Sequence, residues 1–490
     1  MTRSEQPMTF SRLIRKAVFV CWLLHALSSA AQTVKLFAAA EERWDDRFDT
    51  LGLNGPVYAI AVRGQDVYAG GYFTKAGEVS ANNIARWDGS TWHALGNGIS
   101  SSGTPAIVYA LALAADGKLY AAGQFATAGN GNANNIAVWN GSDWARLGSG
   151  GARGTNSTVY ALAAKENEIF AGGIFTMAGD IVVNGVAKWN GVQWSRLGAT
   201  SANGVTGGGV YALSIYGELL IAGGDFANAG AVASVNNIAQ WHITTGTWAA
   251  LAQGINGKVQ SLSGIFFGDL VAGGIFSSAI GVRANNVAKW NGNAWASLGT
   301  GAANGVTGEV RALAAGAGYL YVGGNFFEAG GAPIRSIARR DRNSWSTLSS
   351  GVDGAVHALA YDSSGAVLVG GQFSNAGGKP SKNFGIWHEA TNAVAERNSK
   401  NEIRNFELYQ NYPNPFNPST TIHYYLLRAQ FVHLQIFATN GQEVRTLVQG
   451  RQMAGEHRLR FHASNLSAGV YWYRLAAGDF EQTRKMLLLR

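Results

Sequence analysis

One stretch of sequence, residues 108–148, recurs along most of the chain and constrains its fold more than any other feature. Near copies begin at Val57, Val159, Val210, Val259, Val310 and Val356. Each copy carries a small-residue pair whose second glycine returns at intervals of 47 to 52 residues: Gly71, Gly123, Gly173, Gly224, Gly274, Gly324 and Gly371. A period near 50 with several short strands per unit is typical of a propeller or a solenoid.

Each copy predicts four short strands. In the first copy they cover residues 57–61, 67–73, 82–87 and 90–96, and they are bounded by Gly, Asn and Asp. Dipeptides such as Asp88-Gly89 predict a tight hairpin between the third and fourth strands, because both residues tolerate positive φ angles. The repeats therefore predict an all-β fold.

The last copy lacks its fourth strand, since the pattern stops after Trp387. A match to the missing strand stands before the first copy, at residues 47–52, with Phe48 in place of Trp. We therefore predict that residues 47–52 close the last blade of a seven-bladed β-propeller within residues 32–390, which removes an open sheet edge. An open superhelix is the alternative, but it would not need a complementary terminal strand.

The small-residue pair follows β-branched or aromatic residues, as in residues 320–324, and a Trp and a Leu lie downstream. This pattern resembles kelch-like and galactose-oxidase-type propeller repeats. The resemblance implies a propeller but no activity, because the architecture hosts many functions. Copper chemistry of the galactose-oxidase kind uses a Tyr cross-linked to Cys. The only cysteine is Cys21, which lies in the N-terminal segment that has the features of a signal peptide, so the mature chain is expected to have none. The histidines lack metal-ligand spacing, so we expect no metal, no cofactor and no catalytic residues.

Residues 1–31 have the features of a secretory signal peptide. Arg12, Arg15 and Lys16 precede an apolar run at 17–27, and small residues follow at 29–31. A retained signal anchor is the alternative, which the small residues disfavour. No later segment has 18 consecutive apolar residues, so we expect no membrane span in the mature chain.

The net charge of +8 does not indicate nucleic-acid binding. Residues 1–31 contribute +3 and residues 396–490 contribute +5, so residues 32–395 are neutral overall. A neutral repeat region lacks the basic footprint that a phosphate backbone requires.

Two positions vary in a framework that otherwise repeats. We expect both near the end of the ring where the longer loops emerge, which is where binding residues gather on a rigid scaffold. The residue after the first Val is Tyr58, Tyr109, Tyr160, Tyr211, Gln260, Arg311 or His357. The residue between the small-residue pair and the repeated Phe is Tyr72, Gln124, Ile174, Asp225, Ile275, Asn325 or Gln372. The polar and aromatic members suit a glycan or protein ligand at a pore mouth; relaxed, solvated positions are the alternative.

Two other groups of side chains are better explained as structure. The repeated Trp pairs could stack on carbohydrate, but space filling between blades explains their regularity better. In the sixth copy Arg340 replaces a Trp and Arg342 replaces a hairpin Gly, beside Arg335 and Arg339. An anion contact is conceivable there, and we favour a solvated patch.

The C-terminal part differs in composition from the repeats. Residues 391–403 are polar and predict a linker, and residues 404–490 hold alternating segments that predict about seven strands. The strands are expected at residues 420–425, 431–438, 443–449, 457–462, 470–476 and 482–489, after a Pro-rich segment. This pattern favours an immunoglobulin-like β-sandwich.

Three motifs in this part resemble, in order, those of the type A C-terminal sorting domain of type IX secretion cargo. They lie at residues 411–422, 467–475 and 485–490. The resemblance implies that residues 404–490 engage the type IX secretion machinery, which exports the protein through the periplasm to the outer-membrane surface or the medium. An ordinary spacer sandwich is the alternative.

Together these features predict a secreted or cell-surface propeller that binds a glycan or protein ligand. The first alternative is a secreted hydrolase or lyase acting on polysaccharide at the pore mouth. A passive structural module is the second.

Overall fold

The computed structural model describes residues 42–148, 153–266, 268–389, 407–411, 414–426, 430–452, 455–463, 466–477 and 480–489. The predicted signal peptide and linker lie outside these residues. The chain divides into two compact units, one spanning residues 41–390 and the other containing residues 391–490. Within the described residues both units are built from strands, with two short 3-10 turns, η1 (Arg47–Asp49) and η2 (Gly301–Ala303).

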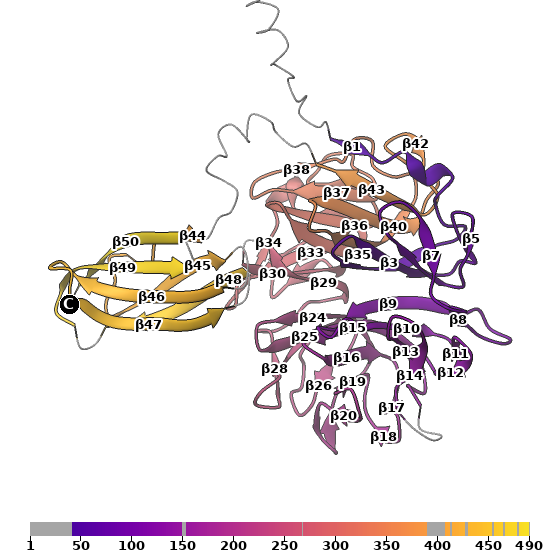
Figure 1. Cartoon of the computed structure of the whole chain (residues 1–490), viewed down its shortest axis with the longest axis horizontal. Helices are drawn as coiled ribbons and strands as arrows, with labels where there is room; N and C mark the ends of the chain where they lie inside the picture. Colours follow the sequence, from indigo (N-terminus) through magenta and orange to yellow (C-terminus); the bar gives the residue numbers. More distant parts are fainter. Residues whose placement is uncertain are drawn as a thin grey trace, which may run out of the picture. The chain divides into compact units, whose positions relative to one another are not determined.

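The first unit contains seven four-stranded antiparallel sheets, numbered here in chain order (Figure 1). Sheets one to three are β2 (Val57–Arg63), β3 (Asp66–Gly71), β6 (Ile84–Trp87) and β7 (Trp92–Ala94); β9 (Ile107–Leu113), β10 (Leu119–Gln124), β13 (Ile136–Trp139) and β14 (Trp144–Arg146); and β15 (Val159–Lys165), β16 (Glu168–Gly173), β19 (Val186–Trp189) and β20 (Trp194–Arg196). Sheets four and five are β24 (Val210–Tyr216), β25 (Leu219–Gly224), β27 (Ile238–His242) and β28 (Thr247–Ala250); and β29 (Lys258–Phe266), β30 (Asp269–Ile275), β33 (Val287–Trp290) and β34 (Trp295–Ser297). Sheets six and seven are β35 (Val306–Gly316), β36 (Tyr319–Ala329), β37 (Ile337–Arg340) and β38 (Trp345–Ser346); and β39 (Ala355–Tyr361), β40 (Ala366–Gln372), β43 (Phe384–His388) and β1 (Arg43–Trp44).

Short strands of two residues decorate the loops of these sheets. They are β4 (Lys75–Ala76), β5 (Val79–Ser80), β8 (Ile99–Ser100), β11 (Thr127–Ala128), β12 (Gly131–Asn132), β17 (Met177–Ala178), β18 (Ile181–Val182), β21 (Gly198–Ala199), β22 (Ala202–Asn203), β23 (Val205–Thr206), β26 (Asn228–Ala229), β31 (Ser278–Ala279), β32 (Val282–Arg283), β41 (Asn375–Ala376) and β42 (Lys379–Pro380). The predicted hairpin between third and fourth strands is confirmed in sheet one, where Gly89 has a φ of 99°. There the Asp88 carboxylate accepts the backbone N–H of Ser90 and of Thr91, each at 2.8 Å.

The first strand of each sheet, called here the inner strand, lies against the inner strands of the neighbouring sheets. This holds from β2 through β9, β15, β24, β29, β35 and β39, and β39 also contacts β2. One hydrophobic cluster fills each junction, and the cluster at the last junction combines Phe384 of sheet seven with Val57 and Trp87 of sheet one. The seven sheets therefore follow one another in a closed cycle.

The small-residue pairs are explained by two close approaches. A Cβ on Gly70 would lie 2.6 Å from Cγ1 of Val108 in the next sheet, so the first glycine lets neighbouring sheets pack closely. A Cβ on Gly71 would lie 2.1 Å from the carbonyl oxygen of Pro56, so the second glycine admits the adjacent inner strand. At the end of the cycle, a Cβ on Gly370 would meet Val57 at 2.6 Å.

In six of the seven described sheets, a tryptophan of the outer strand ties the sheet to the one before it; the exception is Trp194 of sheet three, whose indole N–H has no partner among the described residues. The Trp92 indole N–H donates to the carbonyl of Leu51 at 2.6 Å, and that of Trp144 donates to Leu95 at 2.8 Å. The same bond recurs in sheets four, five and six. These rings are framework, as their regular spacing predicts.

The predicted closing segment is wrong in its position. Residues 47–49 form the turn η1, and the strand that completes sheet seven is β1, whose Trp44 pairs with Trp387 (Figure 1). Trp44 has the indole N–H that the position requires, and it donates to the carbonyl of Leu348 at 3.0 Å. Phe48 has no donor and is instead fully buried, 5.0 Å from Phe384 between ring centroids.

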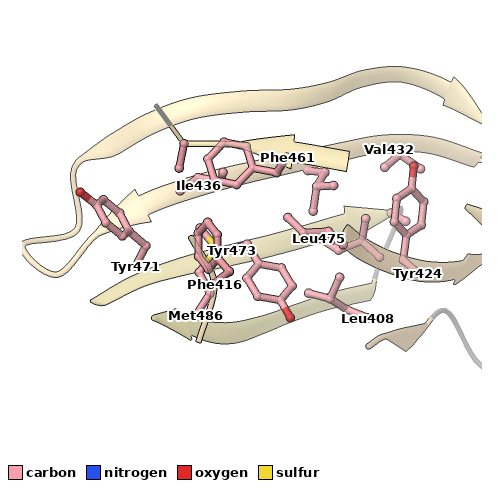
Figure 2. Packing of buried hydrophobic residues seen from close by; sticks show 14 of the residues in the cluster. Leu408, Phe416, Tyr424, Val432, Ile436, Phe461, Tyr471, Tyr473, Leu475 and Met486 are labelled. Atoms are coloured by element: carbon pink, nitrogen blue, oxygen red, sulfur yellow. The ribbon is translucent and has the colours of Figure 1, made fainter. Parts of the chain in front are cut away.

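The second unit consists of two antiparallel sheets around one core. The three-stranded sheet holds β44 (Glu407–Leu408), β45 (Ser419–Leu426) and β48 (Gly455–His462); the four-stranded sheet holds β46 (Gln430–Ala438), β47 (Glu443–Gln452), β49 (Gly469–Ala477) and β50 (Phe480–Leu488). The six strands predicted for this part are confirmed within a few residues. Figure 2 shows their shared core, with Tyr424 and Phe461 from one sheet and Tyr473, Leu475 and Met486 from the other.

Candidate functional site

Backbone geometry singles out the first variable position in every sheet. In sheet one, Val57 pairs with Gly71 and Ala59 pairs with Gly70, so Tyr58 is skipped by the ladder. The same residue is skipped in the other six sheets. A β-bulge of this kind bends the strand and re-aims a side chain. The repeat thus presents one bulged residue from each inner strand at the same end of the unit.

Four of these bulged residues form a continuous aromatic arc. Ring centroids are 5.5 Å apart between Tyr58 and Tyr109, 5.3 Å between Tyr109 and Tyr160, and 5.1 Å between Tyr160 and Tyr211. The rings are tilted by 41° to 55°, which is the offset arrangement that aromatic quadrupoles prefer. Burial raises the pKa of the Tyr109 hydroxyl, and so do the neighbouring tyrosines. Burial also raises the pKa of Tyr58 and of Tyr211, so these three hydroxyls are neutral near pH 7.

The remaining bulged residues form a polar arc. His357 lies 4.8 Å from Tyr58 between ring centroids, and Arg311 donates to its Nδ1 at 3.1 Å. The Glu309 carboxylate accepts hydrogen bonds from Arg311 Nε and from Gln260 Nε2, both at 2.7 Å. These contacts join the polar arc to one end of the aromatic arc.

Lys258, two residues before Gln260 in β29, lies against the other end of the aromatic arc. Its Nζ lies 3.6 Å from the centroid of the Tyr211 ring, a cation–π contact. The seven bulged side chains, with Lys258 and Glu309, are called here the inner-strand ring. Each of the seven residues predicted at the first variable position therefore contacts another of the seven, or Lys258 or Glu309.

The environment sets the charges in the polar arc. Burial lowers the pKa of His357 to about 4, helped by the Arg311 charge, so the imidazole is neutral at pH 7. Its Nε2 atom is buried and has no hydrogen-bond partner among the described residues. Burial raises the pKa of Glu309, but hydrogen bonds from Arg311 and Gln260 outweigh it and keep the carboxylate ionised.

Sequence reasoning missed Lys258 and Glu309. Each stands immediately before the first Val of its copy, a position that holds Pro56, Ile107, Thr158, Gly209 or Ala355 elsewhere. A charged residue at an otherwise uncharged position was the available signal. Residues two places apart in a strand share a face, so the spacing also put this charge on the side of the variable position.

The second predicted set does not form a ring. Tyr72, Gln124, Asn325 and Gln372 are exposed at the ends of their strands. Asp225 is the exception, because it accepts the Tyr211 hydroxyl at 3.3 Å and the Gly209 backbone N–H at 2.7 Å. Burial, together with Asp225, raises the pKa of Tyr211 to about 12. Asp225 therefore supports the ring from outside.

The predicted solvated patch in sheet six is wrong for two of its four arginines, since only Arg335 and Arg342 are exposed. Arg339 and Arg340 are buried, with exposed fractions of 9% and 7%. Arg339 donates to Glu42 at 2.7 Å and pairs with Glu389, and Arg340 lies over the Trp345 ring at 5.4 Å. Arg340 thus replaces a Trp in the framework, and Arg339 joins both ends of the first unit to sheet six.

The motifs of the second unit lie side by side although they are far apart in sequence. Leu487 donates its backbone N–H to the Asn414 side chain at 2.8 Å, and Phe416 and Leu487 are joined by a backbone bond of 2.9 Å. The strand that carries the middle motif, β49, pairs with the C-terminal strand β50. The Tyr473 hydroxyl of β49 accepts the Asn411 backbone N–H at 2.7 Å. One continuous structure thus unites all three motifs.

The described residues contain neither a metal-binding cluster nor a membrane-spanning helix. No group of three or more His, Cys, Asp or Glu side chains in the described residues could hold a metal ion. Among the same residues, no helix has the length and apolar character needed to cross a membrane.

Comparison with known families identifies the second unit. Residues 410–489 match the model of the secretion system C-terminal sorting domain. This match indicates export by the type IX secretion system and an extracellular or cell-surface location. It also implies a link between this domain and the secretion machinery. None of the curated proteins matches the chain.

Solved structures resemble the chain only weakly. PorZ, described as an essential surface component of the type IX secretion system of Porphyromonas gingivalis, is 13% identical with a TM-score of 0.33, and the match covers 89% of this chain and 66% of PorZ. A Bacteroides thetaiotaomicron protein of unknown function is 14% identical with a TM-score of 0.33, covering 68% and 98%. A fungal alcohol oxidase of the AA5 family, in complex with copper, is 12% identical with a TM-score of 0.34, covering 91% and 94%. The chain thus spans just under two thirds of PorZ.

Proposed function

We propose that the first unit is a seven-bladed β-propeller of the kelch-like type, and that the second is an immunoglobulin-like sandwich. The closed cycle of seven sheets supports the propeller, because an open superhelix would leave sheets one and seven apart. The strand β1 supports it further, since it completes sheet seven with residues from the start of the unit. The two sheets around one core support the sandwich.

We propose that this propeller is an exported binding module whose inner-strand ring contacts a glycan or protein ligand. The observation that carries the proposal is the bulge in all seven inner strands, which presents varied aromatic and polar side chains together. The ring offers tyrosine hydroxyls, a neutral imidazole and a partly exposed arginine. Polar and aromatic groups converging on one place are typical of ligand sites on rigid scaffolds.

Alanine substitutions in the ring test this proposal. A glycan array with the full exported chain, followed by calorimetric titration of each hit, gives the reference affinity. Tyr58→Ala, Arg311→Ala and His357→Ala are each expected to weaken binding about tenfold or more, since each removes a contact of 1–3 kcal/mol. Val192→Ala is the control, because Val192 is 81% exposed on a hairpin of sheet three.

Two results would contradict a ligand site at the inner-strand ring. Unchanged affinity in all three ring variants, with circular dichroism showing an intact fold, would place the ligand elsewhere. Loss of binding in the Val192 variant would do the same.

A second candidate function is polysaccharide hydrolysis or lysis at the ring. One observation favours it: the neutral His357 imidazole contacts Tyr58 and lies beside the Arg311 guanidinium. A neutral imidazole acts as a general base through its lone pair, here on Nδ1, once a substrate group takes the place of the Arg311 donor, and the released guanidinium stabilises developing negative charge. Incubating the array hits with the protein and analysing the products separates the two functions, because a binding module returns its ligand intact.

A further inference from the structure

A cavity of about 590 Å³ lies between sheets five and six, outside the inner-strand ring. Its walls come from the loop before β29, the end of β30, the β32–β33 connection and the start of β35. Gly257 and Gly308 in its lining precede Lys258 and Glu309 of the ring. Its volume falls within the range of roughly 300–1,000 Å³ that is typical of small-ligand sites.

One wall of this cavity carries an amide that the other sheets use internally. In sheets one to four the equivalent asparagine donates its side-chain N–H to a loop carbonyl, as Asn184 does to Asn203 at 3.1 Å. In sheet five, Asn304 donates instead to the carbonyl of Arg283 at 2.6 Å. The Asn285 side chain makes no hydrogen bond among the described residues and lines the cavity. Its donor and acceptor are thus available to a ligand.

The same wall carries an arginine that is peculiar to sheet five. Arg283 ends β32, where sheets one, two and three have Ser80, Asn132 and Val182. Its side chain is exposed, lines the cavity and forms no ion pair with any described residue. A planar guanidinium without a carboxylate partner is suited to bidentate recognition of one.

The opposite wall supplies apolar surface and a hydroxyl. The Ile275 side chain is 52% exposed at the end of β30, and Thr307 at the start of β35 is exposed as well. The Thr307 hydroxyl donates to Glu328 at 2.9 Å, which leaves its oxygen lone pair facing outward as an acceptor.

We propose that this cavity binds an acidic saccharide, with Arg283 holding the carboxylate of a uronic acid residue. Asn285 and Thr307 then bond the ring hydroxyls, and Ile275 contacts the apolar face of the sugar. One arginine with neutral donors and acceptors matches one carboxylate on a hydroxyl-rich ring. An acidic peptide would favour more cationic groups, and Arg283 is the one cationic side chain in the lining.

Calorimetric titration of the full exported chain with trigalacturonate tests this site. Arg283→Gln is expected to weaken binding tenfold or more, and Asn285→Ala a few-fold. Arg146→Gln removes an exposed arginine of sheet two, and Asn184→Ala removes the equivalent asparagine of sheet three; both are expected to bind normally. Arg311→Ala is also expected to keep its affinity, because this cavity does not depend on the proposed ring function.

Four results would overturn the assignment. The first is equal affinity of the wild-type and Arg283→Gln proteins for trigalacturonate. The second is equal or tighter binding of a neutral trisaccharide such as maltotriose. The third is tighter binding of triglutamate, which would assign the cavity to an acidic peptide. Loss of trigalacturonate binding in Arg311→Ala alone would place the acidic saccharide in the ring and so refute the cavity site.

Discussion

The outer pairs take two equivalent positions from each sheet and the inner-strand ring takes one, yet the two sets behave in opposite ways. Ring centroids are 5.4 Å apart in the Trp pairs of sheets one to five, and 5.6 Å apart between Trp44 and Trp387. The inner-strand ring instead uses four residue types at its seven bulged positions. The outer positions hold the same residue type in most sheets, whereas the bulged positions share only their backbone geometry.

Burial explains the difference. The outer indoles fill the junction between sheets, and in six sheets one of them donates to a carbonyl of the preceding sheet. Another residue there would leave both a cavity and an unpaired carbonyl. The ring side chains are half-buried and contact mainly one another. They can change without loosening the sheets, which is a property that a recognition surface needs.

Sheet six shows that geometry matters more than residue identity in the framework. Arg340 takes the place of a Trp, and its guanidinium lies 5.4 Å from the Trp345 ring, the spacing of an ordinary pair. A planar cation can replace an indole there because it stacks on the aromatic face. The position therefore selects for a flat group of suitable size.

The largest expected effect comes from breaking a framework pair. Trp248→Ala removes a ring that is 9% exposed, packs on Trp241 and donates to Leu197 at 2.9 Å. We expect a loss of about 3–5 kcal/mol in the free energy of unfolding. Urea denaturation followed by tryptophan fluorescence measures it.

Two further variants sharpen this comparison. Trp248→Phe keeps most of the volume and loses the indole N–H, so we expect a loss of about 1 kcal/mol. Tyr109→Ala in the ring is expected to lose no more than about 1–2 kcal/mol, because the side chain is only half-buried. A Tyr109 variant as unstable as the Trp248→Ala protein would erase the distinction between framework and ring.

A loss of stability smaller than that of Trp248→Ala is expected where Arg339 joins the two ends of the first unit. Arg339→Ala leaves Glu389 and Glu42 without their shared guanidinium, and the Arg339 side chain is only 11% exposed. Removing one partner of a buried pair is costly, and partial exposure of Glu42 reduces the cost to about 2–3 kcal/mol. Thermal unfolding of this variant beside Arg342→Ala, an exposed neighbour, measures the difference. Equal melting temperatures would show that Arg339 does not hold the ends together.

The repeat unit was predictable because its signals are local. Period, small-residue pairs and Asp-Gly hairpins gave four strands per unit, and all four are present in each sheet. The closing strand was misplaced because spacing alone was used. Phe48 and Leu51 match the spacing of a normal fourth strand, whereas η1 is inserted between Trp44 and Leu51. An insertion of this kind leaves no trace in a spacing pattern.

The candidate site was predictable only in part. The first variable position was found, but the bulge that gathers those side chains depends on pairing between strands. Lys258 and Glu309 were missed although each stands two residues before a variable position, because one charged residue in a single copy does not by itself indicate a contact. The cavity beside sheet five was also invisible, because it depends on which carbonyl Asn304 contacts. Three-dimensional packing determines which carbonyl a side chain contacts, and a sequence pattern does not show it.

An effect somewhat smaller than that of Arg339→Ala is expected from the charge of the ring at low pH. His357 has its pKa lowered from 6.5 to about 4 by burial and by Arg311, so the unfolded chain binds more protons between these values. Stability from the neutral ring is therefore complete above pH 6.5 and is lost as the pH falls toward 4. The loss is roughly 2 kcal/mol, because the ring is only partly buried. Comparing the free energies of unfolding at pH 7 and 4.5 measures this loss.

The variant His357→Gln keeps a polar group beside Arg311 but does not titrate, so its stability should fall less than that of the wild type over this interval. His242→Gln, which changes a histidine outside the ring, is the matched control and should retain the wild-type fall. An equal fall in the His357 and His242 variants would show that the ring does not hold His357 neutral.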